Sequence, residues 1–168
     1  LETGWDLFVD PDSTDVSLLI SGPATPATLG TYVVDDIAAK RKDAVAFLSP
    51  LKASVVDNLG SEVASITTDR NNLPNSSYAV LDSGWKYTYD KYNDVYRWVP
   101  LNGDIAGLAA RTDQTDDPWF SPAGATRGNI KNVVKLAWTP KQADRDDLYK
   151  ISVNPVVAFP GQGVMLYG

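Results

Sequence analysis

The segment WVPLNGDIAGLAARTDQTDDPWFSPAGATRGNIKNVVKLAW, from Trp98 to Trp138, is the least generic part of the sequence. Its first part, Asn102 to Arg111, has the pattern of a helix with Asn102 as the N-cap, and its small residues predict close packing against another element. No part of the segment contains an evident reaction centre. After the helix come an acidic loop, an aromatic turn with prolines and an apolar run: Asp113 to Asp117, Pro118 to Gly124 and Ile130 to Trp138.

The length and composition of the chain predict one globular domain over residues 1–168. A chain of 168 residues buries roughly 70% of its unfolded surface in a single core. Hydrophobic residues make up 43% and charged residues 21% of the chain, and no apolar run approaches the ~20 residues of a membrane-spanning helix. The net charge of -6 argues against a nucleic-acid partner, which needs a basic face. We therefore expect no membrane or nucleic-acid partner.

The chain contains neither cysteine nor histidine. It cannot by itself supply a thiolate nucleophile, a Cys/His zinc site or a Ser-His-Asp triad. No cofactor or metal site is predicted. The sequence begins at Leu1 without a charged and then apolar leader, so we expect a fragment of a longer protein.

Three short apolar runs in the first half of the chain predict buried strands at Val16 to Ile20, Ala44 to Leu48 and Tyr78 to Leu81. Helical patterns over residues 29–42 and 55–66 separate them. Strands that alternate with helices indicate βαβ units with a mainly parallel sheet between helices. The sequence therefore predicts a mixed α/β fold.

Residues 85–98 (WKYTYDKYNDVYRW) predict an antiparallel hairpin with a turn at Lys91 to Asp94. Aromatic and polar residues alternate along both halves, as expected for strands. Cross-strand aromatic pairs that stabilise the hairpin are the favoured interpretation. The alternative is an aromatic-faced carbohydrate-binding module, which requires Trp85, Tyr87 and Tyr96 to be exposed together.

The last part of the chain predicts one more helix and two strands. Thr139 to Gln142 reads as a capping box with proline at the first helical position, so the helix should begin there and end near Lys150 or Ile151. The strands are predicted at Val156 to Phe159 and Val164 to Tyr167.

The acidic residues Asp113, Asp116 and Asp117 leave one catalytic alternative open. An Asp-dependent hydrolase would need converging carboxylates with perturbed pKa values in a cleft, with Asp82 near Asp113 and Asp117. Three aspartates within five residues more often form a solvated turn. We favour the solvated turn.

Several segments resemble one family in the family's order. They are WDLFVDPDSTDVSLLISG, YDKYNDVYRWVPLNGDIAGLAARTD, PWFSPAG, RGNIKNVVKLAW, DLYK, NPVVAFPGQG and VMLYG. Together they resemble the tail sheath proteins of contractile-tail bacteriophages of the T-even type. The resemblance runs from about Trp5 to Gly168 and is loosest over residues 23–75.

The resemblance implies a structural subunit of the virion and not an enzyme. Sheath proteins of this family assemble in the host cytoplasm as helical rings around a tail tube, and contraction of the sheath drives the tube into the host cell. The implied partners are other copies of the sheath protein and the tail tube protein. Family members are much longer than this chain, so the fragment alone is expected to be monomeric.

Charged residues outside the predicted core are the candidate subunit interface. Weak, charge-complementary contacts between identical subunits would allow a lattice to rearrange. Our hypothesis is that an acidic loop and a set of basic residues face neighbouring subunits. The residues are Asp113, Asp116, Asp117, Lys40, Arg41, Lys42, Arg127 and Lys131.

Overall fold

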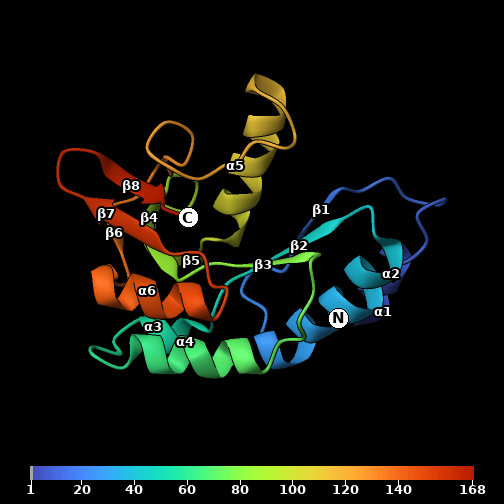
Figure 1. The fold of residues 1–168 in the computed structure, drawn as a ribbon, viewed down its shortest axis with the longest axis horizontal. Coiled ribbons are helices and arrows are strands. Elements are labelled where there is room, and N and C mark those ends of the chain that lie inside the picture. Colours follow the sequence, from blue (N-terminus) through green and yellow to red (C-terminus); the bar gives the residue numbers. More distant parts are fainter. Residues whose placement is uncertain (1) are drawn as a thin grey trace.

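The structure, a computed structural model, describes residues 2–168 and confirms the mixed α/β class (Figure 1). Its strands form three sheets, with orders β1-β2-β3, β5-β4-β6 and β7-β8. The first sheet is parallel and the other two are antiparallel. A short helix α1 (Glu2–Trp5) and a 3-10 turn η1 (Asp6–Phe8) precede the first strand.

The parallel sheet consists of β1 (Leu18–Ile20), β2 (Val45–Leu48) and β3 (Ala79–Leu81), which confirms the three predicted strands. β2 is central, with Leu19 opposite Ala46 and Leu48 opposite Leu81. A continuous helical segment with π-helical turns connects β1 to β2. It is made of η2 (Pro26–Gly30), η3 (Val33–Ala38) and α2 (Ala39–Arg41).

The single helix predicted over residues 55–66 is wrong, because the structure has two helices there. They are α3 (Lys52–Val55) and α4 (Glu62–Asn71). Between them the backbone adopts positive φ at Asp57 (58°) and Gly60 (85°), a conformation that ends a right-handed helix. The apolar spacing that suggested one helix thus spans a break at Gly60.

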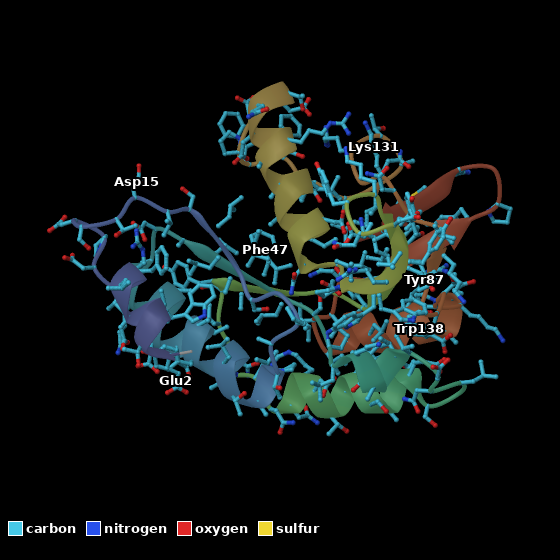
Figure 2. The ribbon with its side chains drawn as sticks, turned by 180° about the vertical axis from the view of Figure 1, so that it is seen from behind. Glu2, Asp15, Phe47, Tyr87, Lys131 and Trp138 are labelled. Atoms are coloured by element: carbon cyan, nitrogen blue, oxygen red, sulfur yellow. The ribbon has the colours of Figure 1, made fainter. Side chains whose placement is uncertain are left out.

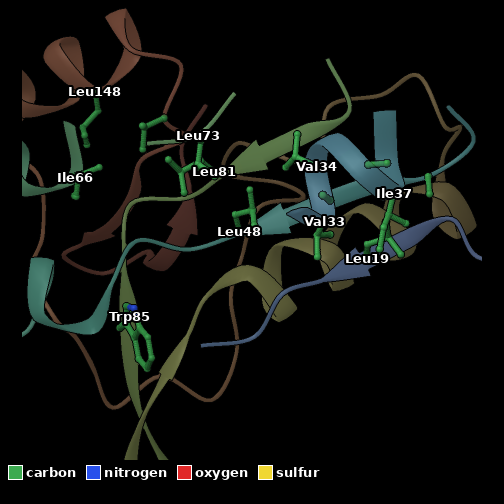
Figure 3. Packing of buried hydrophobic residues seen from close by; sticks show 14 of the residues in the cluster. Leu19, Val33, Val34, Ile37, Leu48, Ile66, Leu73, Leu81, Trp85 and Leu148 are labelled. Atoms are coloured by element: carbon green, nitrogen blue, oxygen red, sulfur yellow. The ribbon is translucent and has the colours of Figure 1, made fainter. Parts of the chain in front are cut away.

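The two faces of β2 are buried by different helices, as strand alternation requires. Ala46 and Leu48 pack with Val33, Val34 and Ile37 in one core cluster (Figure 3). Phe47, on the opposite face, packs in a second cluster with residues of the helix α5 (Asn102–Thr115), as Figure 2 shows. The parallel sheet is therefore the middle layer between two helical layers.

The aromatic hairpin is confirmed as β4 (Trp85–Asp90) and β5 (Val95–Pro100), with Tyr87 opposite Trp98 and Tyr89 opposite Tyr96. A two-residue strand, β6 (Lys135–Leu136), pairs with the other edge of β4. The hairpin turn falls at residues 91–94, as predicted.

Two helix starts differ from the prediction. Leu101 precedes α5, and Asn102 lies inside the helix with its side chain buried instead of serving as the N-cap. The last helix, α6 (Gln142–Lys150), begins later than the predicted capping box, and Asp144 Oδ2 accepts a hydrogen bond from Lys141 N at 2.9 Å. The predicted final strands are confirmed as β7 (Val156–Phe159) and β8 (Gly163–Leu166).

Within residues 2–168, no helix combines the length and the apolar character that crossing a membrane requires.

Candidate subunit interface

The C-terminal turns of α5 stand clear of the sheets in Figure 1 and present the predicted acidic residues. Asp113 lies on an exposed position of the helix and not in a loop, which corrects the predicted loop start. The helix continues to Thr115 because Asp116 N still donates to Thr112 O at 2.9 Å. Asp116 and Asp117 therefore come directly after a rigid helix.

A buried polar network fixes the base of α5. The Asn102 side-chain amide donates to Gly22 O at 2.7 Å and to Ser21 Oγ at 3.2 Å, beyond the end of β1. Asn102 N donates to Ser49 Oγ at 3.0 Å, and the Ser49 hydroxyl is hydrogen-bonded to Asp82 at 2.6 Å. The helix is thereby attached to the ends of all three parallel strands.

Asp82 is the only buried aspartate of this network, and burial has a large effect on its pKa. Its carboxyl also accepts a hydrogen bond from Gly84 N at 2.9 Å. Burial raises the pKa of the Asp82 carboxyl to about 8, although the hydrogen bonds from Ser49 and Gly84 act in the opposite direction. Asp82 is therefore a neutral, structural group at pH 7.

The segment after α5 is held in one shape by Arg127. Its guanidinium lies 3.7 Å from Asp116 and 4.9 Å from the centre of the Phe120 ring. Arg127 Nε donates to Ser121 O at 3.0 Å. The structure thus brings together two of the predicted interface residues, Asp116 and Arg127, within one subunit.

Gly128 attaches the same segment to β8. Gly124 N donates to Leu166 O at 2.9 Å, Leu166 N donates to Gly128 O at 2.8 Å, and Gly128 N donates to Gly124 O at 2.8 Å. A Cβ on Gly128 would lie 2.6 Å from Leu166 O and 2.8 Å from Gly124 O. Only glycine allows the two backbones to approach this closely.

The basic residues 40–42 do not form one surface. Arg41 is buried and donates to Phe8 O at 2.7 Å, to Thr14 O at 2.9 Å and to the Asp43 carboxylate. Lys40 is exposed and pairs with Asp36 at 2.7 Å on its own helix, while Lys42 ends α2 with a φ of 63°. Arg41 anchors the N-terminal segment, so an interface at this position is left to Lys40 and Lys42.

Lys131 is exposed and lies beside the base of the hairpin, as labelled in Figure 2. Its carbonyl accepts a hydrogen bond from Lys86 Nζ at 3.3 Å, and Lys86 Nζ also pairs with Asp104 at 2.8 Å. Lys86 is buried, so this pair connects β4 to α5 inside the molecule. The Lys131 side chain remains available on the surface.

The carboxylates that a hydrolase would need are not gathered. Asp82 lies at the base of α5 beside Ser49, whereas Asp113 is eleven residues along the helix from Asn102, about 16 Å of helical rise. Over the described residues 2–168, no group of three or more histidine, cysteine, aspartate or glutamate side chains is spaced to hold a metal ion. The geometry does not build the cleft that this alternative requires.

The three aromatic residues of the binding-module alternative are not exposed together. Trp85 is buried and its Nε1 donates to Pro50 O at 2.8 Å. Tyr87 is half-buried and stacks on the exposed Tyr96 with ring centres 5.7 Å apart. These contacts are the cross-strand pairs that stabilise a hairpin, and Trp85 belongs to the core.

Sequence reasoning missed the two most conspicuous surface side chains near the acidic residues. Trp119 is 78% and Phe120 is 43% exposed. The sequence signal that could have found them is an aromatic pair between two prolines in a polar segment. No apolar pattern beside the pair indicates a core that would bury it. Their exposure is the strongest indication of a contact surface at this end of the molecule.

Comparison with known proteins identifies relatives of this chain. Residues 15–168 match the model of the phage tail sheath protein central domain. The chain is 45% identical, over its full length, to the tail sheath protein of Enterobacteria phage T4, and 43% identical, over 98% of its length, to that of Vibrio phage KVP40. The chain spans 28% of each of these two relatives.

Solved structures share the fold at low sequence identity. The sheath complex of an extracellular contractile injection system, PVC, in its contracted state superposes with a TM-score of 0.72 at 17% identity, covering 94% of this chain and 40% of that one. The contracted helical sheath of the anti-feeding prophage gives 0.66 at 18% identity, covering 96% of this chain and 42% of that one. The fold is therefore that of a contractile sheath domain.

Proposed function

The chain belongs to the phage tail sheath protein family, and from this premise we propose that it forms part of a subunit that assembles as helical rings around a tail tube. Contraction of those rings would drive the tube into the host cell. The match of residues 15–168 to the sheath central domain carries this proposal. In this account the protein is a structural component of the virion tail, made and assembled in the host cytoplasm, and has no catalytic role.

The surface charges suit contacts that are made and broken between copies. Asp113, Asp116 and Asp117 lie at the free end of α5, and Lys131 lies on the hairpin side of the molecule. Exposed ion pairs are individually weak, at about 0–1 kcal/mol. We propose that these residues, together with Lys40 and Lys42, face neighbouring subunits in one of the two sheath states.

Charge reversal at the end of α5 tests the interface. Asp116→Lys and Asp117→Lys together, in the full-length protein, should prevent assembly or contraction of sheaths seen by electron microscopy. Asp15→Lys is the control, since Asp15 is exposed on the loop before β1, away from the end of α5 (Figure 2). Sheaths of normal length that contract normally in the double variant would refute the interface.

The isolated 168-residue chain is proposed to be a monomer. Relatives are more than three times its length, and assembly would depend on regions outside residues 1–168. Light scattering should therefore give a mass close to 18.2 kDa. A stable dimer or ring of the isolated chain would contradict this part of the proposal.

A further inference from the structure

Residues 113–120, called here the α5 tip, end in an aromatic pair that is largely exposed. Trp119 is 78% exposed, and its ring is stacked near Phe120 with centres 6.4 Å apart. Large aromatic side chains dominate binding energy when a partner buries them, since each removes about 150–250 Å² from water. The α5 tip has the composition of a binding anchor.

The α5 tip is also preorganised. Phe120 N donates to Asp117 O at 3.0 Å and closes a turn. Arg127 contacts Asp116, Ser121 and the Phe120 ring. A partner that binds a segment already held in one shape pays less conformational entropy.

A surface hollow lies elsewhere, on the outer part of the hairpin. It has a volume of about 660 Å³ and is mainly apolar. We call it the hairpin hollow. It is lined by Thr88, Tyr89, Asp90, Lys91, Tyr92, Arg97, Val99, Asn132, Val133 and Val134.

The hairpin hollow offers surfaces that suit an indole ring. Tyr92 is 86% exposed, and the lining residues Val99, Val133 and Val134 add apolar surface. Arg97 is held beside Asp90 at 3.1 Å, and Lys91 lies over the Tyr92 ring at 5.0 Å. An indole that enters the hollow can pack against the Tyr92 ring, and its own ring face can attract the cations Lys91 and Arg97.

The charges of the two surfaces are complementary. The α5 tip carries three carboxylates, at Asp113, Asp116 and Asp117. The lining of the hairpin hollow carries more basic than acidic side chains, although the whole chain has a net charge of -6. The basic residues are Lys91 and Arg97, and the acidic residue is Asp90; the exposed Lys131 precedes the lining residues Asn132 to Val134.

We propose that Trp119 of one subunit inserts into the hairpin hollow of a second copy of this chain. This inference rests on the proposed function and names the surfaces that meet. Two different surfaces of one chain in contact make a heterologous interface, which propagates into a ring or a helix. An acidic, aromatic tip and a basic, aromatic hollow thus supply a repeating contact of the kind that a helical sheath needs.

Cross-linking in assembled sheaths tests the contact. Residues 1–168 contain no cysteine, so Asp117→Cys and Tyr92→Cys can be introduced together into the full-length protein, with any cysteine outside these residues replaced by serine. A short bismaleimide should then join subunits into a ladder of dimers, trimers and longer chains, in extended or in contracted sheaths. Each single variant should give no ladder.

A matched pair controls for random collisions. Asp117→Cys with Leu59→Cys uses a second site that is 97% exposed and lies on the loop between α3 and α4. A ladder no stronger than that of the control pair, in both sheath states, would overturn the inference. If the same sheaths are seen as tubes, the proposed function would still stand.

Removal of the indole gives an independent measurement. Trp119→Ala should raise the protein concentration needed for half-maximal sheath assembly by about 30-fold, the effect of losing one dominant anchor. Trp119→Phe should restore most of the assembly, because a ring is kept. Since the side chain is 78% exposed, both variants should unfold at the wild-type temperature. Assembly of Trp119→Ala at the wild-type concentration would contradict the inference.

Discussion

Replacing Gly128 by alanine should destabilise the chain by an amount that follows from three distances. The added Cβ would meet Leu166 O at 2.6 Å, Gly124 O at 2.8 Å and Gly124 N at 2.9 Å. All three are backbone atoms, which cannot rotate away as a side chain can. The segment after α5 must then move away from β8.

That movement weakens the hydrogen bonds from Gly124 N to Leu166 O and from Leu166 N to Gly128 O. Each contributes about 0.5–1.5 kcal/mol, and overpacking of a tight site costs about 1–3 kcal/mol. We expect Gly128→Ala to lower the free energy of unfolding by about 3 kcal/mol, which lowers the melting temperature by about 6–12 °C in a chain of this size.

Urea unfolding followed by circular dichroism measures this change, and Gly107→Ala is the control. Gly107 is an exposed position inside α5, and a Cβ there would meet nothing within 4 Å. The Gly107→Ala substitution should therefore stabilise the helix by about 0.5–1 kcal/mol. If the free energy of unfolding of Gly128→Ala lies within about 0.5 kcal/mol of the wild-type value, the close approach of the two backbones is not what holds this segment.

Two further predictions concern buried ionisable side chains. The folded state keeps the Asp82 proton up to about pH 8, whereas the unfolded chain releases it near 3.8. The free energy of unfolding should therefore fall as the pH rises from about 4 to 8, by up to about 6 kcal/mol. Asp82→Asn should remove most of this slope in urea unfolding at several pH values, and an unchanged slope would refute the assignment. Arg41→Met leaves the carbonyls of Phe8 and Thr14 without their donor and should cost about 3 kcal/mol, with faster proteolysis within residues 6–14. Lys40→Met, at an exposed pair, should change stability by less than about 0.5 kcal/mol, and equal losses in the two variants would argue against Arg41 as the anchor.

Local patterns predicted most of the strands because the fold buries them as the patterns require. The runs at β1, β2 and β3 are apolar on both faces, and the structure covers both faces of β2 with helices. The period-two aromatic pattern placed β4 and β5 and their turn correctly. The helix break at Gly60 was missed because an apolar period of four residues continues through it.

The network at the base of α5 was beyond sequence reasoning. Asn102 follows Leu101 at the start of a helix, where an asparagine is usually an N-cap. In the structure its amide instead reaches Ser21 and Gly22, eighty residues away in the chain. Only the packing of α5 against the strand ends decides between the two roles.

The candidate interface stays a prediction, and the structure shows only the surroundings of its residues. Charge and position drew attention to Asp116 and Arg127, which meet each other within one subunit after α5. Charge and position did not predict that Arg41 is buried. A cation near a helix C-terminus is expected to be exposed, and only the structure shows that the N-terminal segment covers it. Trp119 was taken as part of a turn, since exposure depends on the direction in which the whole helix leaves the core.

Electron cryo-microscopy of particles assembled from the full-length protein would show whether this domain forms part of a sheath. We expect helical rings around an inner tube, with residues 2–168 fitting each repeat as one body and the α5 tip at a boundary between repeats. Particles in which this domain forms no repeating ring would contradict this expectation. So would a full-length protein that stays monomeric when it is mixed with the tail tube protein.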